Sequence, residues 1–195
     1  MLSAPKIIVV SGPPRSGTSL VMQMLVAGGM EAVSDGQRQT DSDNPRGYFE
    51  HREVLRLAQD PSILSTSVGK AVKIIHALLK YVPRGTPIAV LFLERDLDEV
   101  LASQSIMLER LGRPAPVLSK QQLRNALDKQ LAVARHELTQ RPEAAVLDIQ
   151  HRNLVNAPQI VADQIAKFLE PHLGRLLDAQ VMADCVDPSL YRQRC

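Results

Sequence analysis

The chain has no tryptophan and few aromatic residues of any kind, which make up 3% of its 195 residues. Stacking of bases or sugar rings on aromatic side chains is therefore not expected to dominate recognition. Cysteine is also scarce, because only Cys185 and Cys195 occur and both lie near the C-terminus. Such a pair gives neither a disulfide framework nor the spacing of a metal site, and it fits a reducing cytosol.

Long hydrophobic runs and an excess of one charge are missing as well. The apolar run at residues 7–10 is far shorter than a signal-peptide core, and no segment approaches the roughly 20 apolar residues of a membrane span. We therefore expect a cytoplasmic protein that does not contact a membrane. The 23 Lys and Arg nearly balance the 21 Asp and Glu. Nucleic-acid binding is not expected, and any anion-binding site has to be local.

The sequence does contain an alternation of strand-like and helix-like patterns. Apolar runs rich in β-branched residues predict strands at residues 7–10, 71–75, 88–93 and 145–149. Apolar residues at helical spacing predict helices from residue 20 to the Gly28-Gly29 pair and at residues 53–59, 97–111, 120–140 and 158–169. Residues 34–47 are polar and rich in turn formers, which indicates a surface loop.

This alternation predicts the fold class. A chain of 195 residues can bury one full core but hardly two, so we expect residues 1–195 to form a single domain. Strands that alternate with helices imply right-handed crossovers. The sequence thus predicts an α/β fold of three layers, with a four- or five-stranded parallel sheet flanked by helices. Ligands of such folds bind at the carboxyl ends of the strands.

A glycine-containing loop follows the first predicted strand. Gly12 and Gly17 have the spacing of the G-x-x-x-x-G-K-[ST] loop, directly after a strand and directly before a helix. In such a P-loop the backbone N–H groups converge on an oxyanion, and the helix N-terminus adds partial positive charge. Residues 11–18 therefore predict binding of a phosphorylated ligand, in the first place a nucleotide. A purely structural turn is the alternative.

The loop departs from that motif in one position. Thr18 stands where nucleotide triphosphatases have lysine, and a positive charge occurs instead at Arg15. A triphosphate with bound Mg²⁺ needs that lysine together with an acidic metal partner. Glu94 at a strand end can serve as the acidic partner, whereas no residue replaces the lysine. We expect no metal, and a P-loop kinase or NTPase is kept as an alternative.

The loop resembles that of the sulfotransferase family that uses 3′-phosphoadenosine 5′-phosphosulfate (PAPS) as donor. The family pattern Pro-[Lys/Arg]-Ser-Gly-Thr-[Thr/Ser], which binds the 5′-phosphosulfate, is matched throughout by Pro14, Arg15, Ser16, Gly17, Thr18 and Ser19. In the family an Arg at a later strand end and a Ser eight residues on bind the donor's 3′-phosphate. Arg95 and Ser103 have this spacing. Weaker likenesses at residues 43–54 and 153–169 extend the resemblance from Lys6 to about Leu169.

The resemblance implies transfer of a sulfuryl group to a hydroxyl or amine of a small-molecule or carbohydrate acceptor. Arg15 would stabilise the departing phosphate together with the N–H groups of residues 16–19. The acceptor pocket is expected at residues 34–48 and 107–117. The sequence defines neither the acceptor nor the oligomeric state.

Three candidates remain for the general base: His76, Glu50 and, beside Glu50, His51. Glu50 is similar to the glutamate base of the carbohydrate-modifying branch of the family, and we favour it slightly. His76, at the end of the second predicted strand and after Lys73, is similar to the histidine of the cytosolic branch. Lys73 can contact the donor's bridging oxygen, but it can equally reach solvent.

Each assignment has a simpler alternative. Arg95 can form a salt bridge with Asp96 or Glu99 on the surface. His76 can be a structural residue, and Glu50 can be a charge at a helix start. The chain is shorter than typical members of the family, so a non-catalytic nucleotide-binding relative is kept as an alternative.

Overall fold

Five parallel strands form one sheet in the order β2-β3-β1-β4-β5. The computed structural model describes residues 6–38, 40, 47–114 and 116–190. The strands are β1 (Ile7–Ser11), β2 (Ala32–Val33), β3 (Ala71–Lys73), β4 (Ile88–Glu94) and β5 (Ala144–Gln150). The predicted three-layer α/β fold with a parallel sheet is confirmed. The sequence did not predict strand β2, because its two residues are too few to give a periodic pattern.

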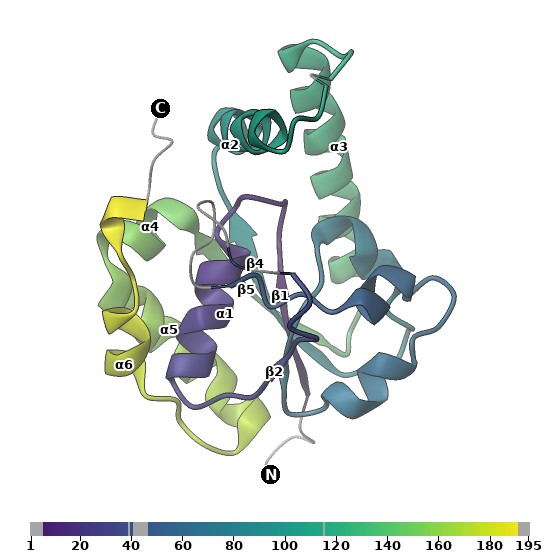
Figure 1. The fold of residues 1–195 in the computed structure, drawn as a ribbon. Helices are drawn as coiled ribbons and strands as arrows, with labels where there is room; N and C mark the ends of the chain where they lie inside the picture. Colours follow the sequence, from purple (N-terminus) through teal and green to yellow (C-terminus); the bar gives the residue numbers. More distant parts are fainter. Residues whose placement is uncertain (1–5, 39, 41–46, 115, 191–195) are drawn as a thin grey trace.

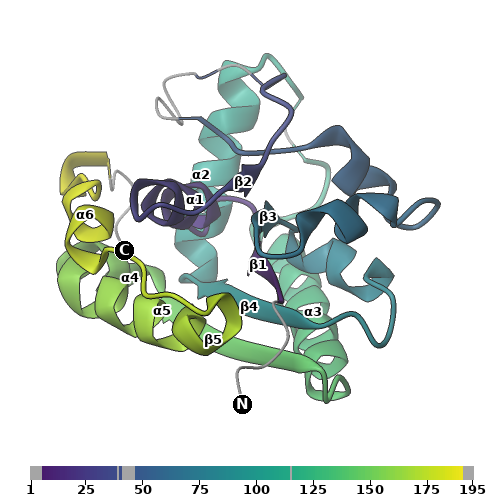
Figure 2. The ribbon, with the colours of Figure 1, turned by 90° about the horizontal axis from the view of Figure 1, so that it is seen from below.

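Helices cover both faces of the sheet (Figures 1 and 2). The α-helices are α1 (Thr18–Ala27), α2 (Leu97–Arg110), α3 (Lys120–Thr139), α4 (His151–Asn156), α5 (Pro158–Leu173) and α6 (Ala179–Asp184). The described residues also form short 3₁₀ helices, namely η1 (Arg52–Arg56), η2 (Ser62–Ser67), η3 (His76–Tyr81) and η4 (Pro188–Leu190). None of the helices in the described part of the chain is both long enough and apolar enough to cross a membrane.

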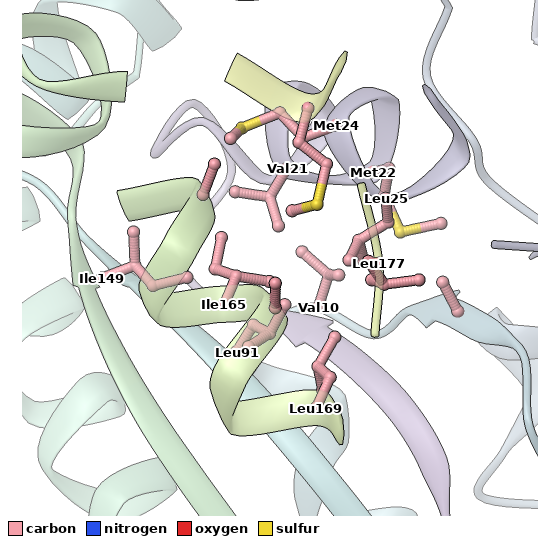
Figure 3. Packing of buried hydrophobic residues seen from close by; sticks show 14 of the residues in the cluster. Val10, Val21, Met22, Met24, Leu25, Leu91, Ile149, Ile165, Leu169 and Leu177 are labelled. Carbon is pink, nitrogen blue, oxygen red and sulfur yellow. The ribbon is translucent and has the colours of Figure 1, made fainter. Parts of the chain in front are cut away.

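The central strand β1 is buried along its whole length because it contributes to two cores. Ile8 and Val10 pack with α1, α5 and α6 on one face, and Figure 3 shows Val10 with Ile165 and Leu169 of α5. Ile7 and Val9 face the opposite core, which η1, η2, η3 and α3 complete. This double burial is why β1 lacks the polar alternation of a strand with one wet face.

Two sequence predictions about the region after β3 are wrong. The predicted strand at residues 71–75 ends at Lys73, and His76 begins η3 instead of ending a strand. The backbone N–H of His76 donates to the carbonyl of Gly12. An apolar run alone does not reveal where the chain leaves the sheet to contact a neighbouring loop.

Candidate active site

The loop between β1 and α1 takes a backbone conformation that few residues can adopt. Gly12, Arg15 and Gly17 have φ values of 145°, 77° and 98°. A Cβ atom at Gly12 would lie 2.8 Å from the carbonyl oxygen of Leu93, and one at Gly17 would lie 2.8 Å from Cδ2 of His151. Both glycines of the motif are therefore required by their φ angles and by close neighbours.

The loop opens onto a cavity of about 490 Å³ at the carboxyl edge of the sheet. Most of the residues that the sequence singled out line this cavity, namely Pro14, Arg15, Gly17, Thr18, Ser19, Glu50, Lys73, Arg95 and Ser103. Ser16 and His76 are not part of its described lining. Ser16 is buried, and its hydroxyl has no hydrogen-bond partner among the described residues. The cavity thus brings together predicted residues from the loop after β1, from the start of α1, from β3 and from α2.

Arg15 is held at both its side chain and its backbone. Its Nε donates to Oγ of Ser103 at 2.9 Å, and its carbonyl accepts from Nη1 of Arg95 at 2.9 Å. The neighbouring carbonyl of Pro14 accepts from Nε2 of Gln104 at 3.1 Å. All three partners lie on α2 or just before it, so this segment contacts the loop at three points.

Arg95 forms an ion pair inside the protein. Its Nε lies 2.9 Å from Oε2 of Glu99, and both side chains are 8% exposed. The salt bridge that the sequence offered as an alternative therefore exists, but it is buried and lies against the loop. Asp96 has another role, since its carboxylate caps α2 by accepting from the N–H groups of Asp98 and Glu99.

Lys73 supplies a cation beside the loop. Its Nζ donates to Oγ of Ser19 at 3.1 Å, to the carbonyl of Tyr48 at 3.0 Å and to Oε1 of Glu50 at 3.2 Å. Only 7% of the side chain is exposed, and burial lowers the pKa of this lysine from its ordinary value. The neighbouring strand β3 thus places a lysine next to the loop, at a position outside the sequence motif.

Glu50 lies at the cavity between two cations. Nη1 of Arg38 is 3.0 Å from both carboxylate oxygens, and Lys73 binds one of them. The guanidinium of Arg38 also stacks on the ring of Tyr48, 3.4 Å from its centroid. With 39% of its side chain exposed, Glu50 is held in place and is still accessible from the cavity.

His76 has structural partners instead. Its Nδ1 lies 3.3 Å from the carbonyl oxygen of Gly12, and its Nε2 lies 3.2 Å from Oε1 of Gln130. The residue is buried. Its contacts connect the base of the loop to α3, which corresponds to the structural alternative that the sequence left open.

His151 is a cavity residue that the sequence reasoning missed. It begins α4 directly after β5, lines the cavity and lies against Gly17. Burial and the nearby charge of Arg95 lower its pKa to about 4. Its place at the carboxyl end of a parallel strand was the available signal, because ligands of such sheets bind there.

Glu94 is not available as a metal partner. Its carboxylate is bound by Arg135 and by Nε2 of Gln150. In the described part of the chain, no group of three or more His, Cys, Asp or Glu side chains is arranged to hold a metal ion.

Both segments that were expected to form the acceptor pocket, residues 34–48 and 107–117, contribute residues to the lining of the cavity. Residues 39 and 41–46 of the polar loop and residue 115 lie outside the described residues. Around them, the lining of the cavity includes Asp35, Gln37, Arg38, Tyr48, Met107 and Arg110. The cavity also has aliphatic walls, formed by Val54, Leu55, Ile75, Leu78, Ile106 and Met107.

No family model and no curated protein matches this sequence. Among solved structures, a sulfotransferase domain from the curacin biosynthetic pathway is similar, with a TM-score of 0.49 and 16% identity over 95% of this chain and 89% of that domain. An unliganded sugar kinase from a Janibacter species has a TM-score of 0.47 and 13% identity, over 87% of this chain and 97% of its own. At this level of similarity neither neighbour assigns a family or an activity to the chain.

Proposed function

We propose that the protein is a sulfotransferase that moves a sulfuryl group from PAPS to a hydroxyl or amine of an acceptor. The observation that carries this proposal is the contact of Lys73 Nζ with Ser19 Oγ beside a loop that lacks the P-loop lysine. Arg15 and Lys73 give the cavity two cations next to a glycine cradle and the N-terminus of α1. This donor set suits a phosphosulfate.

The same contact argues against a kinase or NTPase. In nucleotide triphosphatases the Ser or Thr at the position of Ser19 holds Mg²⁺. Here an ammonium group lies 3.1 Å from that hydroxyl, and a divalent cation bound there would be repelled by it. The usual acidic partner is missing too, because Glu94 is bound by Arg135 and Gln150. A phosphosulfate donor needs no metal between β- and γ-phosphates.

In the proposed reaction the loop amides and Arg15 hold the 5′-phosphate of the donor. The acceptor oxygen or nitrogen forms a bond to sulfur, while the bond between sulfur and the bridging oxygen breaks and leaves its electron pair on the 5′-phosphate. Arg15 and Lys73 stabilise this new charge. Glu50 takes the proton from the acceptor, since its carboxylate faces the cavity beside Lys73. The products are the sulfated acceptor and adenosine 3′,5′-bisphosphate.

The aliphatic walls favour an acceptor that has an apolar part next to its reacting group. Ile75 and Leu78 follow β3, close to Lys73, and Ile106 and Met107 come from α2. Each methylene group of the acceptor that is buried against these walls contributes ~0.8 kcal/mol to binding. A purely polar acceptor would gain nothing from them.

Calorimetric titration tests the donor assignment. We expect adenosine 3′,5′-bisphosphate to bind without metal and ATP with Mg²⁺ to bind weakly or not at all. The Arg15→Ala variant should bind the bisphosphate more weakly, whereas Arg152→Ala, an exposed arginine of α4 outside the cavity lining, should behave as the wild type. Tight ATP–Mg²⁺ binding without bisphosphate binding would overturn the proposal.

A transfer assay separates the enzyme from a non-catalytic nucleotide-binding relative. With ³⁵S-labelled donor and a panel of alcohols and amines, the wild type should transfer label. Glu50→Gln should bind the bisphosphate but lose transfer, because the amide cannot accept the proton. Binding without transfer to any acceptor in the wild type would favour the non-catalytic alternative.

A further inference from the structure

One face of α2 lines the cavity along the second half of the helix. The lining includes Ser103, Ile106, Met107 and Arg110, whose spacing of three, four and seven residues from Ser103 places their side chains on the same face. The chemistry changes in order along this face, from a hydroxyl that accepts from Nε of Arg15, through two apolar side chains, to a guanidinium. The helix follows β4 directly and lies beyond the carboxyl end of that strand (Figure 1). The face therefore leads from the phosphate loop to the exposed Arg110.

The 3₁₀ helix η1 supplies a second wall with apolar and basic residues. Arg52, Val54 and Leu55 of η1 belong to the lining of the cavity. Side chains three residues apart eclipse each other in a 3₁₀ helix, so Leu55 lies on the same side as Arg52. Leu55 is 69% exposed, which leaves its surface available to an apolar ligand.

The charge at Arg52 is offset by a neighbouring acid. Its Nε lies 3.6 Å from Oδ2 of Asp35, and the carboxylate of Asp35 also accepts from the backbone N–H groups of Arg52 and Gln37. These backbone hydrogen bonds lower the pKa of Asp35, which keeps the carboxylate charged. An anion that approached Arg52 would therefore be repelled by Asp35. A ligand anion is better placed at Arg110, in line with the apolar part of α2.

We propose that the acceptor is a hydroxy or amino carboxylic acid, whose carboxylate binds Arg110 and whose aliphatic chain packs against Ile106, Met107 and Leu55. The inference rests on the proposed function, since it places the reacting group of the acceptor beside Arg15. The helix rises by about 10 Å from Ser103 to Arg110. The aliphatic chain between the reacting group and the carboxylate should span about this distance.

The chemistry of the two ends fits such an acceptor. A guanidinium is a planar fork that matches the two oxygens of a carboxylate. At the other end the hydroxyl oxygen or amine nitrogen bonds to sulfur, and its proton passes to Glu50. Because Arg110 is exposed, its ion pair with the acceptor should raise affinity only about fivefold.

Calorimetry with a matched pair of ligands tests the inference without turnover. The probes are 8-hydroxyoctanoate and its methyl ester, which share the chain and the hydroxyl but differ in charge. Each is titrated into the protein saturated with adenosine 3′,5′-bisphosphate. The wild type should bind the acid about fivefold more tightly than the ester, and high salt should reduce this preference because it screens exposed charges. Equal affinities, or binding of neither probe, would overturn the inference.

Two arginine variants test the assignment to Arg110. Arg110→Gln should remove the preference for the acid over the ester. Arg113→Gln is the matched control and should keep the preference, because Arg113 is exposed just after α2 and lies outside the described lining of the cavity. A preference that persisted in Arg110→Gln, or that was lost in Arg52→Gln instead, would contradict the assignment.

Transfer from ³⁵S-labelled donor separates this inference from the proposed function. The wild type should label 8-hydroxyoctanoate with a higher kcat/KM than the methyl ester. Transfer to both with the same kcat/KM would count against the carboxylate site and leave the sulfotransferase proposal intact. If the wild type did not bind adenosine 3′,5′-bisphosphate, the proposed function itself would fail.

Discussion

Arg15 combines a charge at the cavity with an unfavourable backbone conformation. Its φ of 77° is costly for any residue with a Cβ. The loop tolerates this cost because contacts from Arg95 and Ser103 hold the residue. At residue 15, folding stability therefore favours a residue without a Cβ, whereas ligand binding requires the guanidinium group.

Two substitutions of Arg15 separate the effect on stability from the effect on binding. Arg15→Gly should be more stable than Arg15→Ala by about 1 kcal/mol, because glycine adopts positive φ without a Cβ penalty. Both variants should lose affinity for the bisphosphate, because both lack the guanidinium. Urea unfolding gives the stability difference, and calorimetry gives the affinities. Equal unfolding midpoints would show that the backbone at this residue is not under strain.

His151 should make the stability of the protein depend on pH. Its pKa is about 4 in the folded protein against an ordinary 6.5, because burial disfavours the charged ring. Below pH 6.5 the unfolded chain binds a proton that the folded protein does not, so the free energy of unfolding falls as the pH decreases towards 4. The loss attributable to this residue is about 3 kcal/mol.

The His151→Gln variant tests this assignment. Urea unfolding between pH 7 and pH 4 should show a shallower loss of stability in the variant than in the wild type. Glu99 and Arg95 also face this region, so the comparison uses the difference between the two proteins. Parallel pH profiles would mean that another group causes the dependence.

Replacing Lys73 should reduce the rate of sulfuryl transfer more than the affinity for the donor. Its Nζ contacts Ser19 and Glu50, and in the proposed reaction it stabilises charge that develops in the transition state. Lys73→Met should lower kcat by about 10²–10³, measured with labelled donor. Lys70→Met is a matched control, because the Lys70 side chain is 41% exposed and pairs with Glu31 outside the cavity lining. A similar loss in both variants would contradict the role of Lys73.

At the scale of elements, the loop between β1 and α1 depends on its contact with β4. A Cβ at Gly12 would meet Oγ of Ser16 at 2.7 Å and the Leu93 carbonyl at 2.8 Å. The Leu93 carbonyl belongs to the backbone of a central strand, so it cannot move aside cheaply. The loop can follow its path only if residue 12 has no side chain.

Gly12→Ala should therefore lower the free energy of unfolding by about 2–4 kcal/mol and abolish phosphate binding. Gly85→Ala is the control, since Gly85 also has positive φ, at 81°, but a methyl group added there would have no neighbouring atom within 4 Å. This control should lose only about 1 kcal/mol. Chemical denaturation of both variants gives the comparison, and equal losses would show that the contact with β4 does not matter.

For the whole molecule, β1 joins the two cores. Its alternate residues pack on opposite faces of the sheet, so neither core can open without exposing the same strand. The cavity lies at the end of this shared strand. Ligand binding and global unfolding should therefore be coupled.

We expect a single cooperative unfolding transition for the chain. Adenosine 3′,5′-bisphosphate at 100 times its dissociation constant should raise the free energy of unfolding by about 2.7 kcal/mol without added Mg²⁺. Calorimetric melting with and without nucleotide, and with a chelator, measures both effects. Two separate transitions would contradict the expectation of one domain, and a requirement for Mg²⁺ would contradict the proposed donor.

Features that depend on neighbours along the chain were predictable from the sequence. Residues 7–10 are apolar throughout and predicted the first strand, and the spacing of Gly12 and Gly17 predicted the loop that follows it. Helix periodicity predicted α2, α3 and α5 within a few residues. These features follow from local backbone geometry, which residue spacing encodes.

The side chains that meet at the loop are brought together by the arrangement of the strands and helices. The parallel register pairs Val10 with Lys73, which brings the lysine to Ser19 from 54 residues away. Glu99, not Asp96, pairs with Arg95 because Asp96 caps the helix. Such choices depend on strand order and on competition between hydrogen-bond partners, and neither is encoded in the spacing of residues along the chain.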